Sequence, residues 1–302
     1  MTDGNNLLAA VDIGTNSVRL LIAKPNNRLL DAELRTLRMC RLGEGMTSGE
    51  GLQPQAVART VQALQEFNAL LETYGVHQVR TVATSAVREA PNAAFFVDQV
   101  RLQTGLEVDV ISGKEEAYLS YLGACRALPE MRQRVVIDIG GGSTEFAWPS
   151  GMKSSETLVS HSIPLGAVRL TEQPLLLSEI LAGLKPALEP LQAVKPASLI
   201  GVGGTITTLA SVDQALPVYD PERVHGYRLS RAAVERILFF LAAQTNDKRK
   251  QVAGLQPERA DIIVAGTTIL WTILGYLEAE QIIVSEADIL DGIILASFCS
   301  QQ

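Results

Sequence analysis

Two stretches of this chain repeat one pattern, and the repeat limits the folds that the chain can adopt. Residues 10–19 and 136–145 each contain Asp-Ile-Gly, with a Ser five residues after the Asp and a charged residue seven residues after it. The charged residue is Arg19 in the first stretch and Glu145 in the second. Apolar residues flank a turn of small residues in both, which predicts a β-hairpin whose tip lets backbone N–H groups approach an anion closely. One such hairpin in each half predicts two domains with phosphate chemistry in the cleft between them.

The composition is that of a globular protein and restricts its partners. The chain has 302 residues, enough for two domain cores, with 47% hydrophobic and 20% charged residues. Its formal net charge of −7 argues against a broad surface for nucleic acid or for an anionic membrane. An anionic ligand would therefore have to meet a local basic pocket or a metal ion.

The cysteines and the apolar segments are typical of a cytoplasmic protein. Cys40, Cys125 and Cys299 have no C-x-x-C spacing, so we expect buried, reduced thiols. The first six residues lack the basic and apolar regions of a signal peptide. Residues 262–277 are strongly apolar but are interrupted by Gly and Thr, which favours a buried helix over a membrane span.

The order of the expected elements is α/β. A third strand over 32–41 would follow the first hairpin, and the spacing of apolar residues predicts a helix over 54–74 that ends at Gly75. Three strands in a meander, then alternating strands and helices, twice over, is the order of a duplicated ribonuclease-H-like unit. The remaining expected elements are strands at 79–83, 107–111, near Ser160 and at 198–202, helices at 92–104, 115–128, 178–192 and from Ser230 onward, and loops at 216–225 and 246–251.

The segment Val-Ile-Ser-Gly-Lys-Glu-Glu-Ala at 110–117 contains a candidate base. Ser112 followed by Glu115 has the spacing of a capping box, in which Ser112 starts a helix and Glu115 folds back on it. Glu116 is then left on the first helical turn, where the helix dipole favours an ionised carboxylate that can deprotonate water. The alternative is that Glu116 is a surface residue that only complements the dipole.

Three other clusters have both a functional and a structural interpretation. The Gly-rich turn between a strand and a helix at 199–209 can hold a phosphate on exposed N–H groups, or can be only a tight connection. The hydroxyls and Arg88 at 83–88 can be an ordinary helix cap and surface charge. Asp138 and Glu145 can be hairpin and strand residues, or oxygen ligands that together with phosphate suit Mg²⁺.

Together these motifs resemble the exopolyphosphatase / guanosine pentaphosphate phosphohydrolase family of the actin, Hsp70 and sugar-kinase superfamily. The similarity extends in consistent order from residue 11 to about residue 292. The stretches that carry it are VDIGTNSVRLLIA (11–23), ATSAVREAPN (83–92), VISGKEEA (110–117), VIDIGGGSTEF (136–146), PLGAVRLTE (164–172), GVGGTITTLA (201–210) and ERADIIVAG (258–266).

The resemblance implies two ribonuclease-H-like domains of the actin-like ATPase type, with the active site in the cleft between them. The expected domains are 1–125 and 126–285, with a C-terminal helix of about 286–302 packing back on the first and without the HD-type domain of longer relatives. The implied reaction is Mg²⁺-assisted attack of water on the terminal phosphoanhydride of inorganic polyphosphate, or of pppGpp to give ppGpp.

The resemblance also implies residue roles. Glu116 would be the catalytic base, and Asp138 and Glu145 would bind Mg²⁺. The phosphate-binding residues would be Asp12, Gly14, Thr15, Asn16, Ser17, Arg19, Arg88, Gly140, Gly141, Gly142, Ser143, Thr144, Gly203, Gly204 and Thr205.

One departure from the family and two rival functions remain open at this stage. Residues 284–292 stand where many relatives carry Leu-Arg-Glu-Gly, and the arginine is replaced by Asp291 or its neighbours, which puts a guanosine contact in doubt. The rivals are an ATP-dependent kinase or ATPase of the same superfamily and a non-catalytic ppGpp-binding sensor. The sequence does not rank polyphosphate against pppGpp, and a homodimer is compatible with it.

Overall fold

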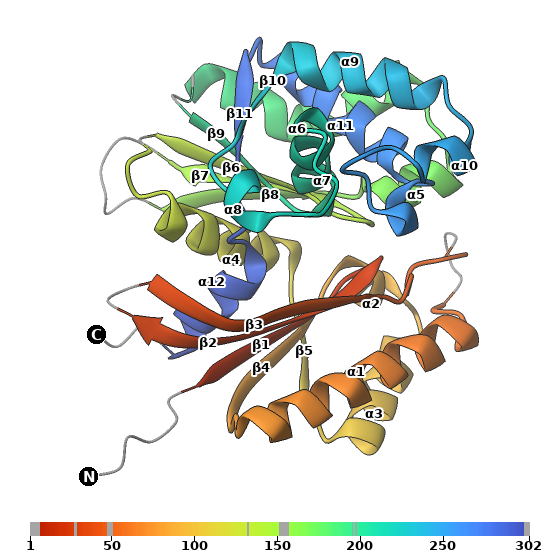
Figure 1. Ribbon diagram of the computed structural model, residues 1–302, viewed down its shortest axis with the longest axis vertical. Coiled ribbons are helices and arrows are strands. Elements are labelled where there is room, and N and C mark those ends of the chain that lie inside the picture. The colour runs from red at the N-terminus through yellow and green to blue at the C-terminus, as the bar shows by residue number, and fades with distance from the viewer. Residues whose placement is uncertain are drawn as a thin grey trace. The chain divides into compact units, whose positions relative to one another are not determined.

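In the computed structural model the described residues are 7–26, 29–46, 51–131, 133–150, 157–194, 196 and 198–298. The chain divides into two compact units (Figure 1). Unit 1 comprises Met1–Arg126 together with Ile289–Gln302, and unit 2 comprises Ala127–Asp288. Cys299 and the last residues of the expected C-terminal helix lie outside the described residues.

Unit 1 contains a five-stranded sheet in the order β3-β2-β1-β4-β5. The first three strands form an antiparallel meander, and β4 and β5 add to it in parallel. This order is that of a ribonuclease-H-like domain, as the sequence predicted. The strands are β1 (Leu8–Ile13), β2 (Ser17–Asn26), β3 (Leu29–Met39), β4 (Gln78–Ala83) and β5 (Val108–Val110).

Helices cover both faces of this sheet, which explains why β1 is apolar at every position except Asp12. Ala9, Val11 and Ile13 belong to the core under α1 and α3, whereas Leu8 and Ala10 belong to the core under α4 and α12 (Figure 1). Because side chains alternate along a strand, a strand that is covered on both faces carries apolar residues toward both of them, and Asp12, next to the end of β1, is the exception. The helices are α1 (Pro54–Tyr74), α2 (Ser85–Glu89), α3 (Ala93–Thr104), α4 (Gly113–Ala127) and α12 (Ile289–Phe298).

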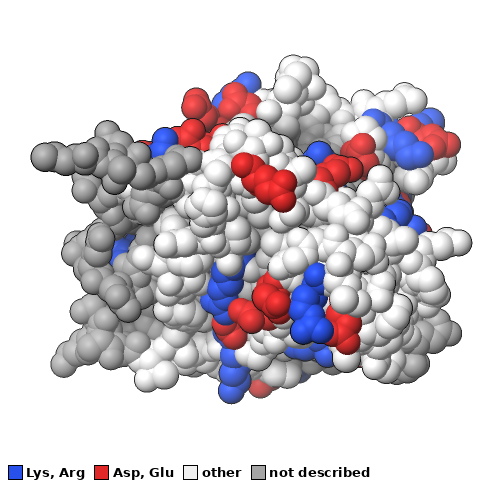
Figure 2. Space-filling model, turned by 90° about the horizontal axis from the view of Figure 1, so that it is seen from below, with Lys and Arg blue, Asp and Glu red and all other residues white. Residues whose placement is uncertain are grey.

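Acidic and basic side chains lie next to one another on the face of the molecule seen in Figure 2. Two exposed pairs of unit 1 are of this kind, Arg38 with Glu66 and Arg59 with Glu44, both at 2.8 Å. Charge that is neutralised locally gives no extended basic surface on that face.

Unit 2 repeats the architecture with one additional strand. Its six-stranded sheet has the order β10-β11-β9-β6-β7-β8, in which β6, β7 and β8 form the antiparallel meander and β9 and β11 continue in parallel. The strands are β6 (Arg134–Ile139), β7 (Thr144–Pro149), β8 (Leu158–Ile163), β9 (Ser198–Val202), β10 (Arg228–Ser230) and β11 (Gln281–Val284).

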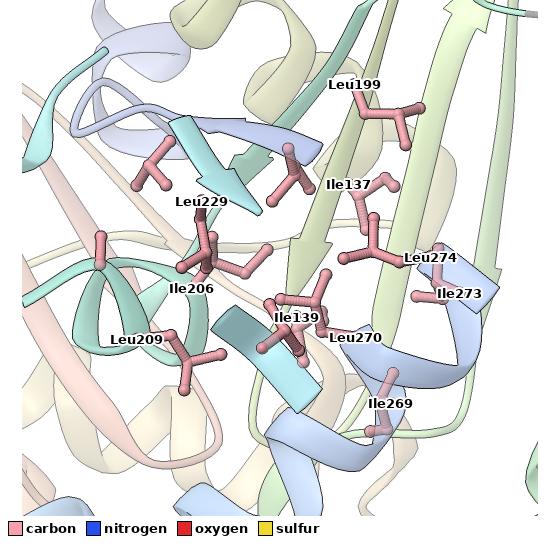
Figure 3. Packing of buried hydrophobic residues seen from close by; sticks show 14 of the residues in the cluster. Ile137, Ile139, Leu199, Ile206, Leu209, Leu229, Ile269, Leu270, Ile273 and Leu274 are labelled. Atoms are coloured by element: carbon pink, nitrogen blue, oxygen red, sulfur yellow. The ribbon is translucent and has the colours of Figure 1, made fainter. Parts of the chain in front are cut away.

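The core of unit 2 is built around the apolar segment that the sequence assigned to a buried helix. Ile269, Leu270 and Ile273 of α11 pack with Ile137 and Ile139 of β6 in one hydrophobic cluster (Figure 3). No helix among the described residues has both the length and the apolar character needed to cross a membrane. The helices of unit 2 are α5 (Ala167–Glu172), α6 (Leu177–Val194), α7 (Gly204–Asp213), α8 (Pro221–Val224), α9 (Arg231–Ala242), α10 (Asn246–Arg249) and α11 (Ile263–Tyr276), with a 3₁₀ turn at Pro257–Arg259.

Both segments expected to be loops contain a short helix. In 216–225 the side chain of Asp220 accepts hydrogen bonds from the backbone N–H groups of Glu222 and Arg223, and Pro221 occupies the first helical position. That combination of cap and proline starts α8, although the two prolines suggested an irregular loop. In 246–251, α10 covers only four residues.

The thiols agree only in part with the expectation of burial. Cys40 is buried and Cys125 is half-buried. Burial is the main cause that raises the pKa of the Cys40 thiol above its ordinary value.

Candidate active site

The first hairpin places Asp12 and Arg19 directly opposite each other on β1 and β2. Asp12 Oδ2 accepts hydrogen bonds from Arg19 Nε at 2.9 Å and from Arg19 Nη2 at 2.7 Å. The turn is closed by a bond of 3.0 Å from Gly14 N to Ser17 O. The predicted phosphate contact Arg19 is thus bound to a buried carboxylate of the same hairpin.

The second hairpin has the same register but two acids. Asp138 and Glu145 are direct cross-strand partners on β6 and β7, and Gly140 N bonds to Ser143 O at 3.0 Å, as in the first turn. Asp138 and Glu145 are only 8% and 2% exposed. Ser162 donates a hydrogen bond of 2.7 Å to Glu145 Oε1. The seven-residue spacing seen in the sequence therefore corresponds to one cross-strand pair in each unit.

The segment after the third strand of each meander folds onto the hairpin turn. In unit 1, Gly43 N donates to Thr15 O at 2.8 Å, and a Cβ added at Gly43 would lie 2.4 Å from the Thr15 side chain. In unit 2, Ala167 N donates to Gly140 O at 2.9 Å, and a Cβ at Gly166 would lie 2.4 Å from the Gly141 backbone. These bonds occupy turn carbonyls, which would otherwise repel an anion. Gly166 stands in the stretch PLGAVRLTE, but neither glycine was among the predicted site residues.

Glu116 lies on the first turn of α4 and is bound to Arg88. Arg88 Nη1 donates to Glu116 Oε2 at 2.8 Å and to Ile111 O at 3.1 Å. The side chains of Arg88 and Glu116 are 22% and 11% exposed. The predicted base and a predicted phosphate contact thus form one nearly buried ion pair.

The capping box predicted beside Glu116 is only half correct. Glu115 N donates to Ser112 Oγ at 3.2 Å, as expected for an N-cap. The Glu115 carboxylate, however, binds Arg80 at 2.7 Å instead of folding back on Ser112. For a carboxylate, a guanidinium on a nearby strand is a stronger hydrogen-bond donor than a backbone N–H group, and only the tertiary structure brings Arg80 close.

The Gly-rich turn before α7 lies against Asp138. Gly203 has a φ of +86°, and a Cβ added there would lie 2.5 Å from Asp138 Oδ1. Thr205, on the first turn of α7, is buried. Glycine is therefore required at 203 both for the left-handed backbone and for the close approach to the acid.

A further cation, Arg259, lies over the start of α7. A Cβ added at Gly204 would lie 2.2 Å from Arg259 Nη1, and Arg259 Nε donates to Gln256 Oε1 at 2.8 Å. Arg259 stands in the stretch ERADIIVAG but was not among the predicted site residues. Its guanidinium is attached to the 3₁₀ turn Pro257–Arg259, which folding brings onto α7.

Next to α7, the Tyr219 hydroxyl donates to Glu286 Oε1. Burial, followed by the charge and the hydrogen bond of Glu286, raises the pKa of Tyr219 far above its ordinary value. Tyr219 therefore remains a neutral hydrogen-bond donor.

The expected departure near residue 291 corresponds to an ion pair in unit 1. Asp291 Oδ2 accepts from Arg35 Nη2 at 2.8 Å. Asp291 thus neutralises a cation of β3.

Two carboxylates in unit 2 have the chemistry of a divalent-cation site. No group of three or more His, Cys, Asp or Glu side chains in the described part of the chain could hold a metal alone. Mg²⁺, however, commonly takes one or two carboxylates and completes its shell with water and substrate phosphates. Asp138 and Glu145 fit this pattern, and Gly203 leaves open the space beside Asp138 Oδ1 that a Cβ would fill.

Comparison with known proteins decides the family. The sequence pattern of the Ppx/GppA phosphatase family matches residues 21–300. The chain belongs to this family. Exopolyphosphatase 2 of Mycobacterium tuberculosis is 35% identical over 96% of this chain and 98% of its own length. The bifunctional 3-dehydroquinate synthase/phosphatase of Fusobacterium nucleatum subsp. nucleatum is 34% identical, and this chain spans 46% of its length.

A solved structure agrees with the membership. The Aquifex aeolicus PPX-GPPA enzyme is 32% identical to this chain and superposes with a TM-score of 0.78. The match covers 96% of this chain and 99% of the Aquifex chain. This Ppx/GppA chain is therefore a phosphatase-family member with the actin-like ATPase fold, as the motifs indicated.

Proposed function

We propose that this Ppx/GppA chain removes the terminal phosphate of inorganic polyphosphate by attack of water, with Glu116 as the general base. The proposal rests on Glu116, a nearly buried carboxylate held on the first turn of α4 by Arg88. A carboxylate fixed in this way can accept a proton from water while its orientation is retained. The chain's similarity along its whole length to a protein named exopolyphosphatase supports polyphosphate as the substrate.

The remaining groups would bind and neutralise the phosphates. The two hairpin turns and the turn before α7 offer backbone N–H groups to phosphate oxygens. Arg19, Arg88 and Arg259 would supply positive charge in a chain whose net charge is −7. Asp138 and Glu145 would hold a divalent cation, for which Mg²⁺ is the best match, and this ion would neutralise charge that develops on the transferred phosphoryl group.

The residues with proposed roles come from both units. Glu116 belongs to unit 1, and Asp138 and Glu145 belong to unit 2, so variants in either unit should lower phosphate release. Conversion of pppGpp to ppGpp is the alternative activity, because it breaks the same type of phosphoanhydride bond. The ion pair of Asp291 with Arg35 argues against an arginine-type contact to guanosine at that position.

The experiment that tests the proposal measures phosphate release from short polyphosphate, long polyphosphate and pppGpp, each with and without Mg²⁺. We expect release from polyphosphate that depends on the cation and needs no ATP. Tight binding of pppGpp or ppGpp without turnover would instead establish a sensor. Transfer of phosphate from ATP to an acceptor, with no hydrolysis of polyphosphate, would establish a kinase.

A further inference from the structure

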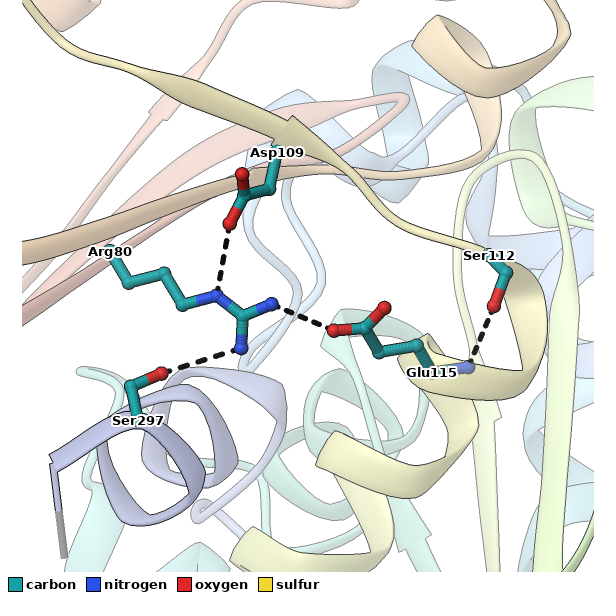
Figure 4. A network of polar contacts seen from close by, with 5 residues as sticks. All are labelled: Arg80, Asp109, Ser112, Glu115 and Ser297. Atoms are coloured by element: carbon teal, nitrogen blue, oxygen red, sulfur yellow. Dashed lines mark hydrogen bonds and ion pairs between the residues drawn. The ribbon is translucent and has the colours of Figure 1, made fainter.

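Arg80 joins four elements of unit 1 beside the first turn of α4 (Figure 4). Its Nε bonds to Asp109 Oδ2 at 3.2 Å, its Nη2 to Glu115 Oε1 at 2.7 Å, and its Nη1 to Ser297 Oγ at 3.3 Å. Arg80 is on β4, and its three partners are on β5, α4 and α12. All three guanidinium nitrogens are thus engaged, each by a different element.

The contact with α4 falls on the residue next to Glu116. Glu115 is fixed at both ends, because its N–H bonds to Ser112 Oγ at 3.2 Å and its carboxylate bonds to Arg80. Arg88 holds the adjacent Glu116 from α2, which follows β4 directly in the chain. Two arginines eight residues apart therefore hold two consecutive carboxylates of the same helical turn.

The exposure of this network shows that it contributes little to stability. The side chains of Arg80, Glu115 and Asp109 are 24%, 41% and 62% exposed, and ion pairs this accessible to water are weak. The network can nevertheless fix the orientation of its partners. The planar guanidinium fixes the direction of each hydrogen bond, whereas a lysine ammonium on a flexible stem does not.

Arg80 also keeps its charge. Partial burial by itself would lower the pKa of its guanidinium, but the hydrogen bonds and charges of Glu115 and Asp109 raise that pKa above its already high ordinary value. The contact with Glu115 is therefore not lost through deprotonation of Arg80.

We propose that Arg80 is a positioning residue for phosphate hydrolysis, which fixes the first turn of α4 through Glu115 and so sets the direction of the Glu116 carboxylate. This inference rests on the proposed role of Glu116 as the base. A displacement of about 1 Å at a reacting group can lower a rate by about 10²-fold, so a weak but directional contact can control turnover.

The test compares Arg80→Gln and Arg80→Lys with Arg101→Gln, which breaks the exposed pair of Arg101 with Asp98 on α3 of the same unit. We expect both Arg80 variants to lower kcat by roughly 10-fold to 10²-fold with little change in KM and with a Tm close to that of Arg101→Gln. Because a positioning defect does not alter which proton is removed, the pH dependence of kcat should keep its shape. A kcat equal to that of Arg101→Gln, or a loss confined to KM, would overturn the inference.

A double-mutant cycle with Glu115→Gln identifies the route of the effect. If Arg80 acts through Glu115, the double variant should be no slower than Arg80→Gln, because both changes break the same contact. Multiplied losses in the double variant would contradict this route.

Amide hydrogen exchange at residues 112–117 provides a readout that does not depend on activity. We expect faster exchange of the Glu115 and Glu116 amides in Arg80→Gln, and no change in Arg101→Gln. The Glu116→Gln variant separates the two proposals. If it keeps normal turnover, the base assignment has failed; if it loses turnover while Arg80→Gln does not, only the positioning role has failed.

Discussion

Arg88 donates a hydrogen bond to Glu116 at 2.8 Å, so two residues that the sequence assigned to different tasks form one ion pair. The carboxylate is nearly buried, and a buried charge requires such a partner. If Glu116 is the base, as we propose, the contact with Arg88 orients its carboxylate before a substrate binds.

The first prediction concerns the base itself. Glu116→Gln should lower kcat by roughly 10²–10⁴-fold, the usual effect of removing a general base, because an amide cannot accept the proton of water. Single-turnover phosphate release from polyphosphate measures the change. The control is Glu107→Gln, the same substitution at an exposed residue of unit 1. Normal turnover in Glu116→Gln would exclude Glu116 as the base.

The second prediction concerns the divalent cation. Removing metal with EDTA should abolish phosphate release, and added Mg²⁺ should restore it. Loss of a residue that only hydrogen-bonds to a metal ligand lowers metal affinity about 10–100-fold. Asp138→Asn changes a proposed ligand itself, so it should raise the Mg²⁺ concentration for half-maximal rate by at least about tenfold. Asp247→Asn, whose side chain is 88% exposed, serves as the control in unit 2. An unchanged Mg²⁺ requirement in Asp138→Asn would remove this residue from the metal site.

The third prediction uses two glycines that both have a positive φ. Gly203 and Gly226 have φ values of +86° and +77°, so alanine is strained at both. Only at 203 would the new Cβ meet Asp138, at 2.5 Å from Oδ1, whereas nothing lies within 4 Å at 226. Both variants should lose about 1–3 kcal/mol of stability from the strain, but only Gly203→Ala should lose most of its kcat/KM. Equal kinetic losses would show that strain, and not the contact with Asp138, is responsible.

The fourth prediction concerns stability at high pH. Burial, followed by the hydrogen bond to Asp213, raises the pKa of Tyr227 to about 12. Between the ordinary pKa of about 10 and this value the unfolded chain loses the proton that the folded protein retains. The stabilisation from Tyr227 is therefore complete below about pH 10 and declines as the pH rises toward 12.

Urea unfolding of Tyr227→Phe checks this sign. At pH 8 the variant should be less stable by about 0.5–1.5 kcal/mol, the value of one hydrogen bond, and the difference should shrink from pH 10 to pH 11. Tyr118→Phe, at an exposed position, is the control. A difference that grows with pH would contradict the raised pKa.

The fifth prediction concerns the attachment of α12 to unit 1. A Cβ at Gly292 would lie 1.9 Å from Leu119 O of α4, whereas a Cβ at Gly275, near the end of α11, would meet nothing within 4 Å. Gly292→Ala should destabilise unit 1 by about 1–3 kcal/mol through overpacking. Gly275→Ala should instead stabilise the protein by up to about 1 kcal/mol through helix propensity. Calorimetric Tm values of the two variants should therefore shift in opposite directions.

The features that the sequence predicted well are determined over short distances along the chain. Helix α1 covers Pro54–Tyr74, as the apolar spacing predicted, and it ends at Gly75 with a left-handed φ of 65°. Each Asp-Ile-Gly hairpin needs only a short turn between two apolar strands, so its register follows from the local sequence. The family motifs, the duplicated fold and the phosphatase membership follow from the same stretches.

The partners of the charged residues were decided only by the tertiary structure. Glu115 binds Arg80, which is 35 residues away in the sequence, and Arg259 reaches the start of α7 from a separate turn. A charged side chain can pair with any opposite charge that folding brings near, and local sequence does not limit that choice. The sequence alone thus determined which acids and glycines this Ppx/GppA protein carries, and packing between distant elements decided what each of them contacts.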